Sequence, residues 1–343
     1  MTSSNPVSLV FFRVLAERGG KPAGLLLDVG PCPGPNPFLS QLFDSEAFAG
    51  LSTGQACFYQ SPFDAALAEV LAGAGWKPLA AGSLVRIDDR LTLDALPPAA
   101  AWVDGDWCMA APPKSSGAQA ASRVHALQMV QLVAADADTH EIEALLRRDP
   151  TLSYNLLRLV NSLGVGSGRG IATLGAGSAR RITSFSQALL ILGRQQLRRW
   201  LNLMLFAARQ GDVRSAMLLS RVALRARALE LLAKSGGLDK NTQEQGFMTG
   251  MFSLLGVLFG MPLAEVLAPL ALGEAVHAAL LRREGELGAL LALFETAEGG
   301  DLAGVAARLD ALQIPHEEFN RAMVDAAAWM QAALRDTSGQ QHG

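Results

Sequence analysis

The sequence predicts a two-part fold, an α/β N-terminal domain followed by an all-α C-terminal helical bundle. Short apolar runs alternate with helical stretches through the first third of the chain. A segment rich in Pro, Ser, Gly and Ala, from Ala110 to Ser122, comes next, and beyond it apolar residues recur at helical spacing. We therefore expect domains over residues 1–112 and 123–335, a linker over 113–122 and a disordered tail over 336–343.

The composition is that of a globular protein. The chain has 343 residues, half of them apolar, with a net charge of −3 and a charged fraction of 18%. The charge gives no basic excess, so nucleic acid is not an expected partner. Cys32, Cys57 and Cys108 lack CxxC spacing, which argues against a disulfide framework and against a zinc site. With no basic region before the short apolar run 7–12, we expect a cytoplasmic protein.

The N-terminal domain contains five apolar runs typical of strands and two helical stretches. The runs are residues 7–15, 23–30, 55–60, 83–88 and 100–109, and the helical stretches are residues 37–50 and 61–75. Strands that alternate with helices predict a parallel sheet. The four to five strands are fewer than the eight of a closed α/β barrel.

The C-terminal domain reads as helical almost throughout. Helices are expected near residues 138–149, 150–160, 184–208, 214–234, 249–260, 262–272, 274–281, 286–298 and 315–334. The glycine-rich insert 164–179 contains neither a strict GxGxxG motif nor a following GK[ST], so we interpret it as a flexible loop.

One uncharged segment, residues 246–264, approaches the length of a membrane span. It contains Gly250, Gly256, Gly260 and Pro262, and it lacks flanking Lys, Arg, Trp and Tyr. We therefore expect a helix buried inside the protein and no membrane insertion.

Two motifs resemble the HDOD family, a non-catalytic offshoot of the HD phosphohydrolases. They are "RRDPTLSYNLLRLVNS", residues 147–162, and "ARRITSFSQALLILGRQQLRRWL", residues 179–201. Catalytic HD proteins carry a metal-binding His-Asp pair in a helix similar to residues 250–258, where this chain has Ser253 and Leu254. The resemblance therefore implies no catalytic residue, no metal and no cofactor.

The N-terminal domain resembles a shortened EAL domain, the cyclic-di-GMP phosphodiesterase type. The resemblance rests on "DGDWCMAAPPKSSGAQAASRVHALQMV", residues 104–130, and on "SPFDAALAEVLAGAGWKPLAA", residues 61–81. The Glu-Ala-Leu signature and the "DDFG" metal motif are both absent, so the resemblance implies a degenerate domain. The whole chain then resembles a hybrid EAL-HDOD protein.

Candidate binding residues are mainly arginines. A cationic face for an acidic protein segment or an anionic nucleotide is predicted at Arg180, Arg181, Arg194, Arg198 and Arg199, although a solvated face explains them as well. Arg221 and Arg225, with Arg227 off their face, are interpreted as surface residues. Asp88 and Asp89 are interpreted as a solvated turn, and the five histidines, His125, His140, His277, His316 and His342, show no ligand spacing.

These features predict a non-enzymatic bacterial signal-transduction protein. We expect it to contact other signalling or regulatory proteins in pathways of cyclic di-GMP, motility or gene regulation, with a homodimer as one possible form. One alternative is a nucleotide-sensing module with a groove lined by Arg194 and Arg198. The other is a residual metal-dependent phosphohydrolase that uses Asp88, Asp89 or His140.

Overall fold

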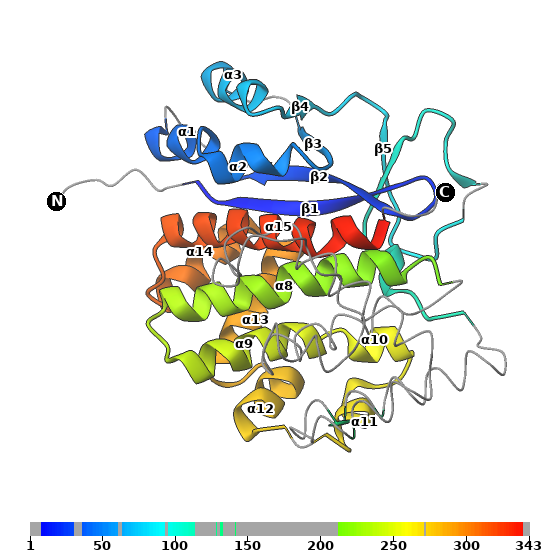
Figure 1. Cartoon of the computed structure of the whole chain (residues 1–343), viewed down its shortest axis with the longest axis vertical. Helices are drawn as coiled ribbons and strands as arrows, with labels where there is room; N and C mark the ends of the chain where they lie inside the picture. Colours follow the sequence, from blue (N-terminus) through cyan, green and yellow to red (C-terminus); the bar gives the residue numbers. More distant parts are fainter. Residues whose placement is uncertain are drawn as a thin grey trace, which may run out of the picture.

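The computed structural model describes residues 8–30, 36–60, 64–92, 95–113, 212–270 and 272–338, together with positions 128, 131–132 and 141. Figure 1 shows the β-sheet with helices α1, α2 and α3 on one side and the long helices α8 and α15 on the other. The predicted linker and the helices expected between residues 123 and 211 lie almost wholly outside the described residues. The domain boundaries therefore stay a prediction.

The described residues form one six-stranded mixed sheet with the strand order β4-β3-β2-β1-β6-β5. The strands are β1 (Val10–Glu17), β2 (Pro22–Val29), β3 (Ala56–Tyr59), β4 (Lys77–Pro78), β5 (Leu84–Arg86) and β6 (Trp102–Asp104). All five predicted strands are present, and the sheet also contains the two-residue β4, at the end of the segment 61–81 that resembles a helix and the following strand of an EAL domain.

The expectation of a parallel sheet is wrong for β1. Strand β1 pairs antiparallel with β2 and with β6, whereas the pairs β2–β3, β3–β4 and β5–β6 are parallel. The reason is the short turn between β1 and β2, closed by a hydrogen bond of 2.9 Å from the Glu17 amide to the Lys21 carbonyl. A turn of this length holds no crossover helix, so it can join only antiparallel strands.

Three short helices cover one side of the sheet: α1 (Pro37–Phe43), α2 (Glu46–Leu51) and α3 (Ala65–Gly73). The helix predicted over 37–50 is two helices, because Ser45 begins a new one. Its hydroxyl accepts a hydrogen bond from the Phe48 amide, which is the usual N-cap arrangement. The rings of Phe48 and Trp76 then stack with 4.8 Å between their centroids, in the core between the sheet and these three helices.

The C-terminal part is entirely helical within residues 212–338. Its helices are α8 (Ser215–Ser235), α9 (Lys240–Phe252), α10 (Leu255–Phe259), α11 (Leu263–Leu267), α12 (Glu274–Arg282), α13 (Gly285–Glu298), α14 (Leu302–Ala311) and α15 (His316–Ser338). The predicted continuous helix over 246–264 is divided among α9, α10 and α11. Gly260 ends α10 in the left-handed conformation at φ 63°, and Pro262 precedes α11. No helix among the described residues could cross a membrane.

The sheet and the C-terminal helices share one apolar core. Phe11 of β1 meets Phe294 of α13 edge to face, with 5.4 Å between the ring centroids. The side chain of Asn320 in α15 makes two hydrogen bonds to the backbone at the start of β1. Its Oδ1 accepts from the Val10 amide at 2.8 Å, and its Nδ2 donates to the Ser8 carbonyl at 2.9 Å. Helix α15 therefore covers the part of β1 that precedes its pairing with β6.

Candidate functional site

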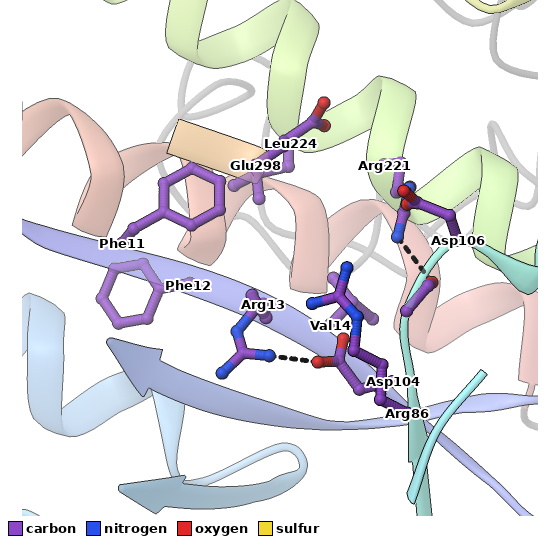
Figure 2. Close-up of a pocket in the computed structure, with 11 residues that line it drawn as sticks. Phe11, Phe12, Arg13, Val14, Arg86, Asp104, Asp106, Arg221, Leu224 and Glu298 are labelled. Atoms are coloured by element: carbon purple, nitrogen blue, oxygen red, sulfur yellow. Dashed lines mark hydrogen bonds and ion pairs between the residues drawn. The ribbon is translucent and has the colours of Figure 1, made fainter. Parts of the chain in front are cut away.

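A charged cleft lies where β1, the end of β6, helix α8 and helix α13 meet (Figure 2). Its space amounts to about 450 Å³, part of it open to solvent. The lining combines apolar side chains with three arginines and three carboxylates: Phe11, Phe12, Arg13, Val14, Arg86, Asp104, Gly105, Asp106, Arg221, Leu224 and Glu298. Clefts at the junction of two parts of a chain are common binding sites. Whether this cleft can bind a charged ligand depends on the partners that its arginines and carboxylates already have.

Arg13 is held by carboxylates from the two strands beside β1. Its Nε and Nη2 bind the two oxygens of Asp28 at 2.5 and 2.9 Å, and its Nη1 pairs with Asp104. Burial alone would lower the pKa of Arg13, but the two carboxylates raise it above the ordinary arginine value. The Arg13 guanidinium therefore carries a permanent positive charge, and the carboxylates of Asp28 and Asp104 compensate it within the sheet.

The turn Asp104–Asp106 connects the sheet to helix α8. Arg221 of α8 donates to the Asp106 carboxylate at 2.7 Å and to the Gly105 carbonyl at 2.8 Å. Gly105 has φ +100°, and a Cβ there would lie 2.3 Å from the Ile87 carbonyl oxygen, so only glycine fits. The sequence motif "DGD" thus forms a turn whose two ends bind different arginines.

Asp88 supports the same turn from the outside. Its carboxylate accepts from the Asp106 amide at 3.2 Å and from Arg86 Nε at 3.1 Å. Both hydrogen bonds lower the pKa of this exposed carboxyl, the one from Arg86 more. The interpretation of Asp88 and Asp89 as part of a solvated turn fits these contacts.

Ser253 and Leu254, which the resemblance aligns with a metal-binding pair, lie at the end of α9. The Leu254 side chain is buried. The Ser253 hydroxyl donates to the Gly250 carbonyl and accepts a 2.7 Å hydrogen bond from Nη1 of Arg225. Arg225 also pairs with Glu298, and its Nη1 lies 3.8 Å from Glu295.

The expectation that Arg221 and Arg225 are surface residues is therefore wrong. The Arg225 side chain is only 4% exposed, and that of Arg221 is 19% exposed. Most of α8 is covered by α9, α13 and α15, which leaves no solvated face for Arg225. Arg227, predicted to lie off their face, pairs with Glu230 at 2.8 Å.

The donor set around Ser253 does not fit a divalent metal. A guanidinium occupies the space beside Ser253, a leucine carries no ligand atom, and a positive charge at 2.7 Å from the hydroxyl opposes a second cation. Nowhere in the described part of the chain do three or more His, Cys, Asp or Glu side chains form a group that could hold a metal.

Several predicted site residues lie outside the described residues: Arg180, Arg181, Arg194, Arg198, Arg199 and His140. The structure brings together a different set. Arg13 and Arg221 meet Asp104, Asp106 and Glu298 around the cleft, and Arg225 pairs with Glu298 beside it. One signal in the sequence pointed to part of it. Arg13 interrupts the otherwise apolar run "VFFRVL", and an arginine at such a place requires a carboxylate partner.

Residues 120–268 match the family model of the HDOD domain. This match supports the HDOD family. The matched region contains α8, α9, α10 and α11, together with the positions of both motifs in residues 147–201. Ser253 and Arg225 therefore belong to the HDOD-matching region, whereas the cleft lies where this region meets the sheet.

Two curated proteins are similar to parts of the chain. The protein named cyclic di-GMP phosphodiesterase CdgJ, from Vibrio cholerae serotype O1, is 32% identical over 196 residues, which are 57% of this chain and 42% of that protein. The uncharacterized protein YuxH of Bacillus subtilis is 27% identical over 159 residues, 46% of this chain and 36% of that protein. The chain thus matches less than half the length of either relative.

One solved structure is also similar. It is named "Putative phosphohydrolase", from Shewanella amazonensis SB2B, and the likeness covers 58% of this chain and 93% of that chain at 16% identity and a TM-score of 0.34. At this TM-score the likeness does not indicate a shared fold or a shared activity.

Proposed function

We propose that this chain is a non-enzymatic signal-transduction protein that acts by contact with other proteins in a pathway linked to cyclic di-GMP. The hydrogen bond from the buried Arg225 to Ser253 carries the non-enzymatic part of the proposal. Where the resemblance places a metal ligand, the chain has a hydroxyl already bound to a fixed cation. The name of the Vibrio cholerae relative supports the link to cyclic di-GMP.

The alternative of nucleotide sensing gains no support from the cleft. Arg13 is paired with Asp28 and Asp104, and Arg221 is paired with Asp106. Arg86, the exposed arginine of the lining, pairs with Asp88. A phosphate group would have to compete with carboxylates for each of these guanidinium groups, and three acidic side chains in the lining would repel it.

A hydrolysis assay on the metal-analysed protein tests the non-enzymatic proposal. The full chain, purified without chelator, is analysed for bound metal and then incubated with cyclic di-GMP and added Mg²⁺ or Mn²⁺. We expect no stoichiometric metal and no turnover above buffer, with the Vibrio cholerae relative as the reference enzyme. Turnover that disappears on substitution of a named residue of this chain would contradict the proposal.

A separate experiment tests the contact with other proteins. Tagged full-length chain is recovered from its source cells after mild crosslinking, and each co-purifying protein is then tested for direct binding with purified components. We expect at least one defined partner that binds the purified chain without added nucleotide. If the chain is recovered alone under conditions of both high and low cyclic di-GMP, the contact proposal is wrong.

A further inference from the structure

Three arginines form a stripe along helix α8. Arg214, Arg221 and Arg225 are separated by seven and four residues, spacings that bring side chains to one side of an α-helix. Their side chains are between 4% and 19% exposed. We call these three residues the α8 arginine stripe.

The first two arginines of the stripe bind the segment where the chain leaves the sheet. Arg214 Nη1 donates to the carbonyls of Cys108 and Ala110. Arg221 binds the Gly105 carbonyl and the Asp106 carboxylate. Two of the three stripe residues are therefore fixed to the segment that follows β6.

The third arginine binds the end of α9 and the end of α13. Arg225 donates to Ser253 and pairs with Glu298. Glu298 lines the same cleft as Arg221 and Asp106, as Figure 2 shows. Burial alone would lower the pKa of Arg221, but Cys108, Glu298 and Asp106 together raise it above its ordinary value. One carboxylate thus acts on both Arg225 and Arg221.

We propose that the α8 arginine stripe is a relay that couples the Asp104–Asp106 turn to Ser253, with Glu298 as the exchangeable partner. A buried guanidinium that loses its carboxylate is strongly destabilised. When the turn withdraws Asp106, Arg221 therefore takes Glu298. Arg225 then keeps only Glu295, which lies 3.8 Å from its Nη1, and turns from Ser253 toward that carboxylate. The other carboxylate of the turn, Asp104, is unavailable because it binds Arg13. The relay rests on the proposed function, for which it provides a route between the two parts of the chain.

Hydrogen–deuterium exchange on the full chain with the substitution Asp106→Asn tests the relay. We expect exchange at the amides of residues 249–256 to rise at least about five-fold, the lower end of measured couplings between sites. Helix α14, which carries no stripe contact among the described residues, should exchange as in the wild type. In a Glu298→Gln background, where no charge is left to exchange, Asp106→Asn should produce no further rise.

The control is Glu274→Gln, which removes a carboxylate from an exposed pair with Arg282 and should change nothing at residues 249–256. A rise confined to residues 84–110, or spread evenly over all helices, would overturn the relay. If Asp106→Asn does not fold, Arg221→Lys replaces it, since lysine keeps the charge but loses the two-pronged contact. The exchange experiment needs no partner and no nucleotide, so its failure leaves the proposed function intact, and turnover in the hydrolysis assay would leave the relay intact.

Discussion

Arg225 on α8 and Ser253 at the end of α9 are joined by a hydrogen bond of 2.7 Å, and the Ser253 hydroxyl passes a second one to the Gly250 carbonyl. The contact is partly buried and includes the carboxylate of Glu298. It connects three helices at the position that the resemblance to the HD phosphohydrolases aligns with a metal-binding pair. The ion pair between Arg225 and Glu298 lies directly beside that position.

Replacing Arg225 should strongly destabilise the protein. Arg225→Ala leaves Glu298 without its partner, and breaking a buried pair in this way lowers the free energy of unfolding by about 3–5 kcal/mol. Arg282→Ala, which removes exposed pairs with Glu274 and Glu284, should change it little. Urea unfolding followed by circular dichroism measures both. Equal midpoints for the two variants would show that the Arg225 cluster adds no stability.

The crossing of α8 and α9 should tolerate no side chain at Gly250. A Cβ at this position would lie 2.4 Å from the Ala226 Cα, so Gly250→Ala must push the helices apart. We expect a loss of about 1–3 kcal/mol in the free energy of unfolding. Gly73→Ala in α3 is the matched change, because no atom lies within 4 Å of its Cβ position, and it should be neutral or slightly stabilising. Thermal melting of both variants tests the contrast, and similar shifts would contradict it.

Asn320 should be essential to the attachment of β1. Asn320→Ala removes its hydrogen bonds to the Val10 amide and the Ser8 carbonyl, and a buried amide left unpaired at Val10 costs about 1–3 kcal/mol. Asn241→Ala, on the exposed surface of α9, should stay within about 0.5 kcal/mol of the wild type. Amide exchange at residues 8–12 gives a local reading, since only loss of the Asn320 contact should accelerate it.

The Cys57 thiol should be unreactive in the folded protein at neutral and mildly alkaline pH. Burial raises its pKa from 9.0 to about 12, so the thiolate forms only in strong alkali. Because the folded pKa is raised, the contribution of this thiol to stability is complete below about pH 9 and is lost as the pH rises toward 12. Labelling with a disulfide reagent at pH 8, before and after unfolding in urea, measures the reactivity. Cys57→Ala should lose this part of the pH dependence, and rapid labelling of native Cys57 would contradict the prediction.

Much of the fold was predictable, because the local patterns are strong. The run around Phe12 is apolar and ends at glycines, and Ser45 and Asp64 have the residue types of helix N-caps. The direction of β1 differs from the expected parallel sheet, because the turn Arg18–Lys21 is too short to hold a crossover helix. The contact between Val10 and Asn320 spans 310 residues, and no local pattern signals it.

The site was harder to predict than the fold. Arg221 and Arg225 are four residues apart, a spacing that predicts a charged outer face on the helix. Burial shows the opposite, because the partners Ser253 and Glu298 come from helices that only the tertiary structure brings together. The apolar neighbours of Arg225 along α8, Val222 and Leu229, were the signal that this face is covered. The arginines predicted to bind a partner, Arg194 among them, are still predictions.

The position of α15 against β1 has a consequence for synthesis on the ribosome. Strand β1 emerges before α15, and the side chain of Asn320 that binds its backbone follows some 310 residues later. At elongation rates of about 5–20 residues per second, this interval is roughly 15–60 s. During that time the apolar residues of β1, Phe11 among them, lack their final cover. The nascent chain should therefore be a client of the chaperones that shield apolar segments until translation has passed α15.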